Sequence, residues 1–187
     1  GNGAMGAVIK DVIKNLNNSE NILINDKVDG NFPNHHPDPT VPKNLVDIIA
    51  KVKEEQADLG LAFDGDADRI GVITNEGQVI WPDRQMMLFS RDCLKRYPNE
   101  PVIFDVKCSS HLSSIIAQSG GQPVMFKTGH SLIKAKMKEL KAPLAGEMSG
   151  HIFFNDEWFG FDDGVYVACR LLRILSEQLS SASALFK

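Results

Sequence analysis

The chain has 187 residues, of which 43% are hydrophobic and 24% are charged, and its formal net charge at pH 7 is −4. This length suits one large or two small globular domains, and the acidic balance argues against a nucleic-acid partner. No apolar run is long enough to span a membrane, and no signal peptide opens the sequence. The three cysteines are far apart, which predicts reduced thiols in a cytoplasmic protein rather than a disulfide framework.

The first half of the sequence predicts helices around a small set of strands. Apolar residues recur at helical spacing in two segments, and a stretch rich in proline and asparagine between them cannot be helical. Three apolar runs follow as strands, and a helix begins at Pro82, because proline is tolerated in the first turn. In chain order, the expected elements are a helix at 7–16, a strand at 22–24, a loop at 29–42, a helix at 43–56, strands at 59–63, 70–73 and 79–81, and a helix from 82 to about 96.

The second half alternates strands with helices, and this alternation predicts the α/β class. The turn-rich segment Tyr97-Pro-Asn-Glu-Pro101 predicts a domain boundary, which gives one domain at 1–97 and another at 98–187. The expected elements of the second domain are a strand at 102–106, a helix at 109–118, a strand at 123–126, a helix at 131–140, an apolar pair at 144–145, a strand at 152–154 and a last helix that opens at residue 162.

Three carboxylates alternate with small residues between two of the expected strands, in Asp64-Gly-Asp-Ala-Asp-Arg69. The small spacers allow a tight loop to turn Asp64, Asp66 and Asp68 inward, where the like charges repel one another unless a cation neutralises them. Hard oxygen ligands in a compact loop suit Mg²⁺ or Ca²⁺, and Arg69 is a fixed cation that suits a phosphate oxygen. The loop therefore predicts a metal-assisted phosphate site.

Other interpretations of this loop explain less of it. An EF-hand needs glycine at the sixth loop position and glutamate at the twelfth, which here hold Arg69 and Asn75. A haloacid-dehalogenase-type phosphotransferase also has Asp-x-Asp after a buried strand, but it has no place for a third carboxylate at Asp68. A solvated acidic turn does not require three aspartates in strict alternation between apolar strands.

A second polar loop, Gly146-Glu-Met-Ser-Gly-His151, lies between two apolar runs. Its glycines let the backbone approach a ligand. The Glu147 carboxylate can accept hydrogen bonds from vicinal hydroxyls, and Ser149 can add another. His151 titrates near neutral pH and is suited to proton transfer. An ordinary turn with a capping serine remains an alternative for this loop.

Four motifs together resemble the α-D-phosphohexomutase family, in its phosphomannomutase/phosphoglucomutase branch. They are the aspartate loop, the loop at 146–151, Asp29-Gly-Asn-Phe-Pro-Asn-His-His-Pro-Asp-Pro39 and Lys127-Thr-Gly-His-Ser131, in the order of the family. The resemblance implies two consecutive α/β domains with mixed sheets covered by helices, the family's second domain without its first strand and then its third. It also implies an intramolecular phosphotransferase that interconverts hexose 6-phosphate and hexose 1-phosphate through a phosphoserine and a bisphosphorylated sugar.

The resemblance further implies roles for individual residues. Mg²⁺ would be held by Asp64, Asp66 and Asp68, while Arg69 and His151 would stabilise phosphate or transfer a proton. A mannose or glucose phosphate, or the 1,6-bisphosphate, would contact Arg69, Lys107, His130, Glu147, Met148, Ser149, Gly150 and His151.

The family's phosphoserine loop has no match in the sequence, and neither has the phosphate loop of its fourth domain. We therefore expect the chain alone to be inactive, and its missing first and fourth domains are expected partners. The alternative is a stand-alone divalent-cation or sugar-phosphate binding module without turnover.

Three further features have simpler interpretations. Ser110-His111 imitates the missing phosphoserine loop, but its place at a helix start predicts a capping serine. His35-His36 with a nearby aspartate resembles a metal cluster, yet adjacent side chains point apart and two prolines stiffen the loop, which predicts a structural role. The aromatic segment 158–163 is expected to support the second loop and to cap the last helix through Asp162 or Asp163.

Overall fold

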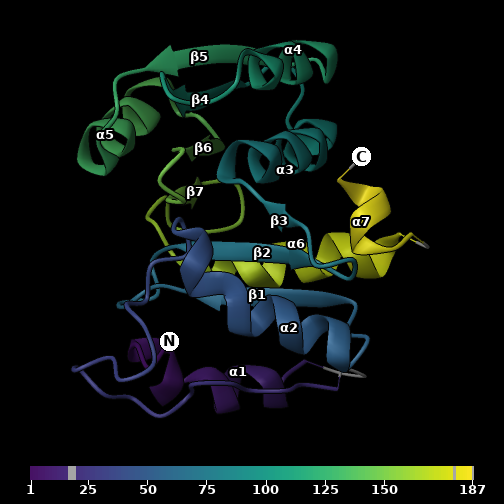
Figure 1. The fold of residues 1–187 in the computed structure, drawn as a ribbon. Helices are drawn as coiled ribbons and strands as arrows, with labels where there is room; N and C mark the ends of the chain where they lie inside the picture. Colours follow the sequence, from purple (N-terminus) through teal and green to yellow (C-terminus); the bar gives the residue numbers. More distant parts are fainter. Residues whose placement is uncertain (17–19, 179, 187) are drawn as a thin grey trace.

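The computed structural model describes residues 1–16, 20–178 and 180–186. Its strands form two sheets, and Figure 1 shows the first sheet lying below the second, with helices between them and on their outer faces. The predicted α/β class is confirmed. Within these ranges, no helix has both the length and the apolar character needed to cross a bilayer.

The first sheet is antiparallel and has the strand order β1-β2-β3, with bounds Leu59–Phe63, Ile70–Thr74 and Val79–Ile80. Helix α2 (Val46–Glu54), which continues from the 3-10 turn Pro42–Leu45, covers one face, and α6 (Gly164–Glu177) lies against the other (Figure 1). Side chains alternate along β2, so that Ile73 packs with the residues of α2 while Val72 packs with those of α6.

The N-terminal segment lies below β1 in Figure 1 and contains the 3-10 turn Ala4–Ala7 and helix α1 (Ile9–Lys14). The predicted strand at 22–24 is wrong, because these residues belong to no strand in the described chain, and Ile22 is 52% exposed. Strand β1 is the edge of the described sheet, and a groove of about 1050 Å³ separates it from α1. That a first strand is missing here remains a prediction.

The second sheet is mixed and has the order β5-β4-β6-β7, in which only the β6–β7 pair is antiparallel. Helices α3 and α4 pack on one face and α5 on the other. The side chain of Ser109, rather than the predicted Ser110, caps α4 by accepting a hydrogen bond from the His111 N–H. The bounds are Pro82–Arg96 for α3, Pro101–Asp105 for β4, Ser110–Gln118 for α4, Gln122–Phe126 for β5, His130–Leu140 for α5, Leu144–Gly146 for β6, Ile152–Phe154 for β7 and Ala182–Leu185 for α7.

One hydrophobic core joins the two sheets. A single cluster of buried side chains includes Val72 of β2, Phe89 of α3, Phe154 of β7 and Leu171 of α6. Helix α3 packs on α4 and β6, so it belongs with the second sheet although the sequence suggests a boundary after it. We therefore propose a boundary ahead of α3 in place of the one expected after residue 97.

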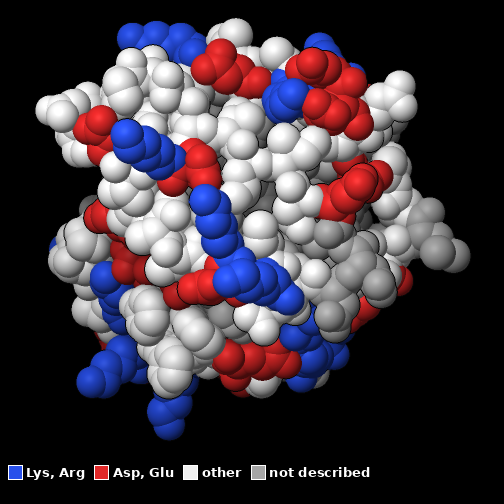
Figure 2. All heavy atoms as spheres, turned by 90° about the horizontal axis from the view of Figure 1, so that it is seen from below, with Lys and Arg blue, Asp and Glu red and all other residues white. Residues whose placement is uncertain are grey.

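Charged side chains are interleaved on the underside of the molecule. Figure 2 shows lysine and arginine side chains next to aspartate and glutamate side chains across this face. No broad basic area covers it, so this face gives no support for a polyanion-binding surface.

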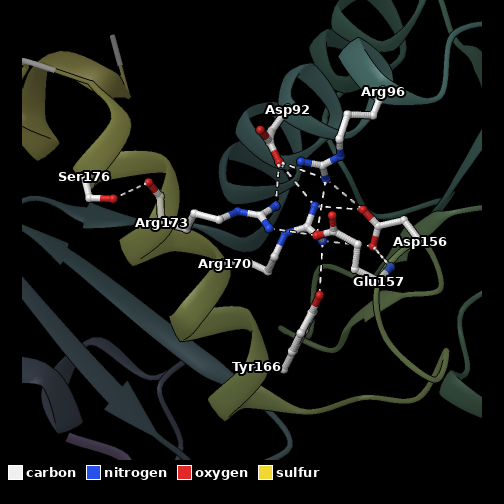
Figure 3. Close-up of polar contacts among 8 residues, drawn as sticks. All are labelled: Asp92, Arg96, Asp156, Glu157, Tyr166, Arg170, Arg173 and Ser176. Carbon is white, nitrogen blue, oxygen red and sulfur yellow. Dashed lines mark hydrogen bonds and ion pairs between the residues drawn. The ribbon is translucent and has the colours of Figure 1, made fainter. Parts of the chain in front are cut away.

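A network of charged side chains ties α6 to α3 and to the turn after β7 (Figure 3). The Arg170 side chain is 3% exposed, and its guanidinium donates two hydrogen bonds of 2.9 Å to the carboxylate oxygens of Asp156. It also donates to Asp92 at 3.2 Å and lies 4.4 Å from the centre of the Phe154 ring. Arg96 donates a further 2.9 Å bond to Asp156. Opposite charges therefore compensate one another where little water reaches them.

This network predicts a loss of stability in acid. Burial acts to raise the pKa of Asp156, but the hydrogen bonds and charge of Arg170 outweigh it, and the pKa lies below its ordinary value. A carboxylate whose pKa is lower in the folded than in the unfolded state stabilises the protein above the ordinary aspartate pKa of about 4. This stability is lost as pH falls through the pKa of the folded state. Urea titrations at neutral pH and below about pH 4 measure the free energy of unfolding at each pH. Its decrease between the two should be larger for the wild type than for Asp156→Asn. Equal losses would contradict this expectation.

Candidate functional site

The aspartate loop, residues 64–69, joins β1 to β2 in a tight turn in which Ala67 has a left-handed φ of +66°. One ligand oxygen from each of Asp64, Asp66 and Asp68 lies within 4.8 Å of the others. Asp64 is buried and Asp66 is exposed, so the cluster opens toward solvent on one side. A hard divalent cation takes oxygen ligands, and these three carboxylates fit it.

The negative charge of this loop is only partly compensated within the described chain. Arg69 donates hydrogen bonds to Asp64 from its backbone N–H at 3.1 Å and from Nε at 2.7 Å, and its Nη1 lies 3.4 Å from Asp38 Oδ1. Burial, followed by repulsion from Asp64 and Asp66, raises the pKa of Asp68 to about 7. The Asp68 Oδ1 is buried without a hydrogen-bond partner among the described residues, although the Arg69 Nε is 3.7 Å away. A bound divalent cation would relieve this repulsion.

The second loop, residues 146–151, joins β6 to β7 and is closed by a 2.9 Å hydrogen bond from the Glu147 N–H to the His151 carbonyl. The Glu147 side chain is 2% exposed, and its Oε1 accepts a 2.6 Å bond from the Gly129 N–H. This carboxylate therefore holds the start of α5, and its contact with sugar hydroxyls stays a prediction. The Ser149 hydroxyl lies 2.8 Å from His151 Nδ1 and so fixes the imidazole ring.

The two loops, residues 64–69 and 146–151, meet at one place. An isolated β-bridge pairs Arg69 with His151, and His151 Nε2 lies 3.4 Å from Asp68 Oδ2. The loop at 146–151 follows the carboxyl end of β6, which runs parallel to β4, and so lies at the sheet edge where ligand sites of α/β proteins form. Residues far apart in the sequence therefore form a single polar site.

His130 and Asp162 extend this site. The His130 ring stacks on the His151 ring with centroids 5.5 Å apart, and its Nδ1 lies 3.7 Å from Asp162. Asp162 also accepts a 2.9 Å hydrogen bond from Lys134. Burial lowers the pKa of His151, although the charges of Asp162 and Glu147 oppose the shift. The His151 imidazole is therefore largely neutral near pH 7.

Sequence reasoning missed Asp105, which is fully buried at the end of β4. Its Oδ1 accepts a 3.1 Å hydrogen bond from the Met148 N–H, and its Oδ2 accepts a 2.8 Å bond from the Thr128 hydroxyl. Asp105 thereby joins β4 to both neighbouring loops. The available signal is an aspartate near the carboxyl end of the strand predicted at 102–106, since strands that alternate with helices place ligand sites at their carboxyl ends. Asp162 was expected only as a helix cap, and its aromatic surroundings give no signal of a site.

The remaining predicted substrate residues lie around the two loops. The Lys107 side chain is 55% exposed, with Nζ 3.9 Å from Asp105 Oδ2. Met148 packs partly against the core, and Gly150 has a φ of +102° beside the Arg69 side chain. Their roles in substrate binding stay predictions.

The features with simpler interpretations make structural contacts. His35 Nδ1 lies 3.0 Å from the His36 carbonyl oxygen, and the His36 ring meets the Phe32 ring edge-on. The Trp158 ring stacks on Tyr166 of α6 at 4.4 Å. The Asp163 carboxylate caps α6 by accepting a hydrogen bond from the Tyr166 N–H, as one of the two predicted caps.

Comparison with known proteins adds independent evidence. Residues 1–77 match the family model for phosphoglucomutase/phosphomannomutase alpha/beta/alpha domain II, and residues 81–187 match the model for domain III. A phosphomannomutase/phosphoglucomutase from Pseudomonas syringae pv. tomato is 60% identical over the whole chain, and a phosphoglucomutase from Neisseria meningitidis serogroup A is 57% identical over 94% of it.

A crystal structure of a phosphoglucomutase/phosphomannomutase family protein from Burkholderia thailandensis has the same fold. Its TM-score is 0.95 at 52% identity, and the match covers 98% of this chain. The chain spans 40% of the length of the Pseudomonas relative and 40% of the Burkholderia chain. The two family matches and these similarities show that the chain belongs to the phosphoglucomutase/phosphomannomutase family and comprises its domains II and III.

Proposed function

We propose that this chain supplies the metal-binding and sugar-recognition loops of a phosphomannomutase/phosphoglucomutase. The complete enzyme would interconvert hexose 6-phosphate and hexose 1-phosphate in the cytoplasm, through a phosphoserine and a bisphosphorylated sugar. The observation that carries the proposal is the meeting of the two loops, where His151 Nε2 lies 3.4 Å from Asp68 Oδ2. A carboxylate cluster that fits a cation and a set of hydrogen-bonding side chains lie next to each other, so a single sugar phosphate could contact both.

Some residues of the site would bind the phosphate group and others the sugar. Asp64, Asp66 and Asp68 would hold Mg²⁺, which when bound offsets the negative charge of a transferring phosphoryl group. The Arg69 guanidinium is held by Asp64 and Asp38, so it is pre-oriented for a phosphate oxygen.

His151 presents Nε2 to the site while Ser149 lies at Nδ1. As a largely neutral imidazole it can accept a hydroxyl proton and return it. His130 and Lys107 are the exposed donors for substrate phosphate, and the backbone of Met148 and Gly150 with Glu147 and Ser149 would border the sugar. Mannose and glucose phosphates and the 1,6-bisphosphate are the proposed ligands, and the first and fourth domains of a longer chain are the proposed partners.

The first test is activity with and without the missing domains. Glucose 1-phosphate and Mg²⁺ would be supplied with a dehydrogenase that reports glucose 6-phosphate. The 187-residue chain should give no steady product, because no donor serine loop is found in its sequence, whereas a full-length polypeptide that includes such a loop should turn over. Steady turnover by the purified chain, or none by the full-length protein, would contradict the proposal. Ligand binding without turnover in the full-length protein would favour the stand-alone binding module.

Metal binding gives a separate prediction. Mg²⁺ should bind this chain weakly, because the phosphoserine ligand is missing and Mg²⁺ sheds its waters reluctantly. Asp66→Ala should lower the affinity measured by calorimetry about tenfold or more. Asp11→Ala removes an exposed carboxylate on α1 and serves as the control, with unchanged affinity expected. Equal affinities for the wild type and Asp66→Ala would rule out the assignment.

A further inference from the structure

The backbone of the aspartate loop is held from two sides by distant parts of the chain. On one side, the Ala4 N–H donates a 2.8 Å hydrogen bond to the Gly65 carbonyl. On the other, the Gly164 N–H at the start of α6 donates a 3.0 Å bond to the Ala67 carbonyl. These two carbonyls belong to the spacer residues that separate Asp64, Asp66 and Asp68.

Each of these contacts depends on a glycine. A Cβ at Gly164 would lie 2.8 Å from the Ala67 oxygen and 3.0 Å from the Arg69 oxygen. A Cβ at Gly3, next to the donor Ala4, would lie 2.7 Å from the Gly65 oxygen and 2.8 Å from the Asp64 oxygen. The obstacles are backbone atoms of the loop rather than the ends of flexible side chains. A methyl group at either position therefore displaces the loop backbone.

The conformation of Ala67 explains why the loop needs this support. Its φ of +66° lies in the left-handed region, which is unfavourable for every residue with a side chain and is populated freely by glycine. Such a conformation persists where the surroundings over-determine it. The hydrogen bond from Gly164 holds the Ala67 carbonyl, and the orientation of this peptide sets the direction of Asp66 and Asp68 on either side of it.

We propose that Gly3 and Gly164 are positioning residues for the cation. They admit two backbone N–H groups that clamp the aspartate loop with its carboxylates converging before a metal binds. This inference rests on the proposed metal-binding function, and it adds that the N-terminal segment and α6 determine the affinity of the site from outside it.

Mn²⁺ binding to the 187-residue chain tests the proposal, with the free ion followed by its paramagnetic resonance signal. Gly164→Ala and Gly3→Ala should each weaken binding about 10- to 100-fold, the range for residues that orient metal ligands. Gly30→Ala is the matched control, since a Cβ there meets nothing within 4 Å, and its affinity should equal that of the wild type. The double variant Gly164→Ala/Ala67→Gly should regain part of the affinity, because glycine lowers the cost at which the displaced loop returns to the left-handed turn when the cation binds. A structural role for Gly164 alone predicts no such rescue.

The outcomes separate this proposal from the one on which it rests. A wild-type chain that binds no Mn²⁺ would remove the metal site and the clamp together. Measurable wild-type binding of any strength that Gly164→Ala and Gly3→Ala leave unchanged would remove the clamp alone.

A measurement on the wild type covers the case in which the variants do not fold. Because coupling is reciprocal, saturating Mg²⁺ should slow hydrogen exchange of the Gly164 amide by a similar factor, about tenfold or more. Unchanged exchange at Gly164 in a chain that binds Mg²⁺ would overturn the proposal.

Discussion

Replacing Arg170 by methionine is expected to lower the free energy of unfolding by about 3–5 kcal/mol, the cost of removing one member of a buried ion pair. Methionine keeps much of the side-chain length but no charge. The substitution leaves the Asp156 carboxylate, whose side chain is 0% exposed, without its two-pronged partner, and Arg96 supplies only one hydrogen bond in its place. Urea unfolding at neutral pH measures the loss.

Arg91 provides the matched control for this substitution. It is an exposed arginine on α3, and Arg91→Met should change the unfolding free energy by no more than about 0.5 kcal/mol. A similar small change for Arg170→Met would show that the network in Figure 3 adds no stability. Arg170→Met combined with Asp156→Leu should recover part of the loss, since no buried carboxylate then lacks a partner.

Asp105→Ala is expected to lower the free energy of unfolding by about 2–3 kcal/mol, the upper part of the cost of an orphaned buried donor. It leaves the partly buried Met148 N–H without its acceptor, and an orphaned buried donor costs about 1–3 kcal/mol. The Thr128 hydroxyl also loses its acceptor but is near solvent. The amide of Met148 should exchange with solvent faster, because it reports directly on the release of the second loop from β4.

Asp105→Asn separates the hydrogen bond from the charge. Asparagine retains one carbonyl oxygen of nearly the same shape, so it can still accept from the Met148 N–H, and its loss of stability should be smaller than that of alanine. If Asp105→Ala left the stability and the exchange of the Met148 amide unchanged, this carboxylate would not connect the loop at 146–151 and the turn at Thr128 to β4.

The sequence predicts local features of this molecule better than its long-range contacts. The aspartate loop and the loop at 146–151 can be recognised because small spacers and polar side chains between apolar strands form a short-range pattern. The strand predicted at 22–24 is wrong because a run of three apolar residues does not indicate whether a partner strand is available to pair with it. The roles of Asp105, Asp162 and Gly164 depend on contacts with residues that are distant in the sequence. Local sequence patterns do not predict these contacts.

The position of α6 has a consequence for the order in which the molecule is made. Strand β2 is synthesised long before α6, yet α6 covers one apolar face of the sheet to which β2 belongs. At about 5–20 residues per second, that face remains uncovered on the ribosome for several seconds. During this interval the nascent first sheet exposes Val72 and its neighbours to other apolar surfaces, including those of chaperones. The first sheet therefore completes its core only when α6 has been synthesised.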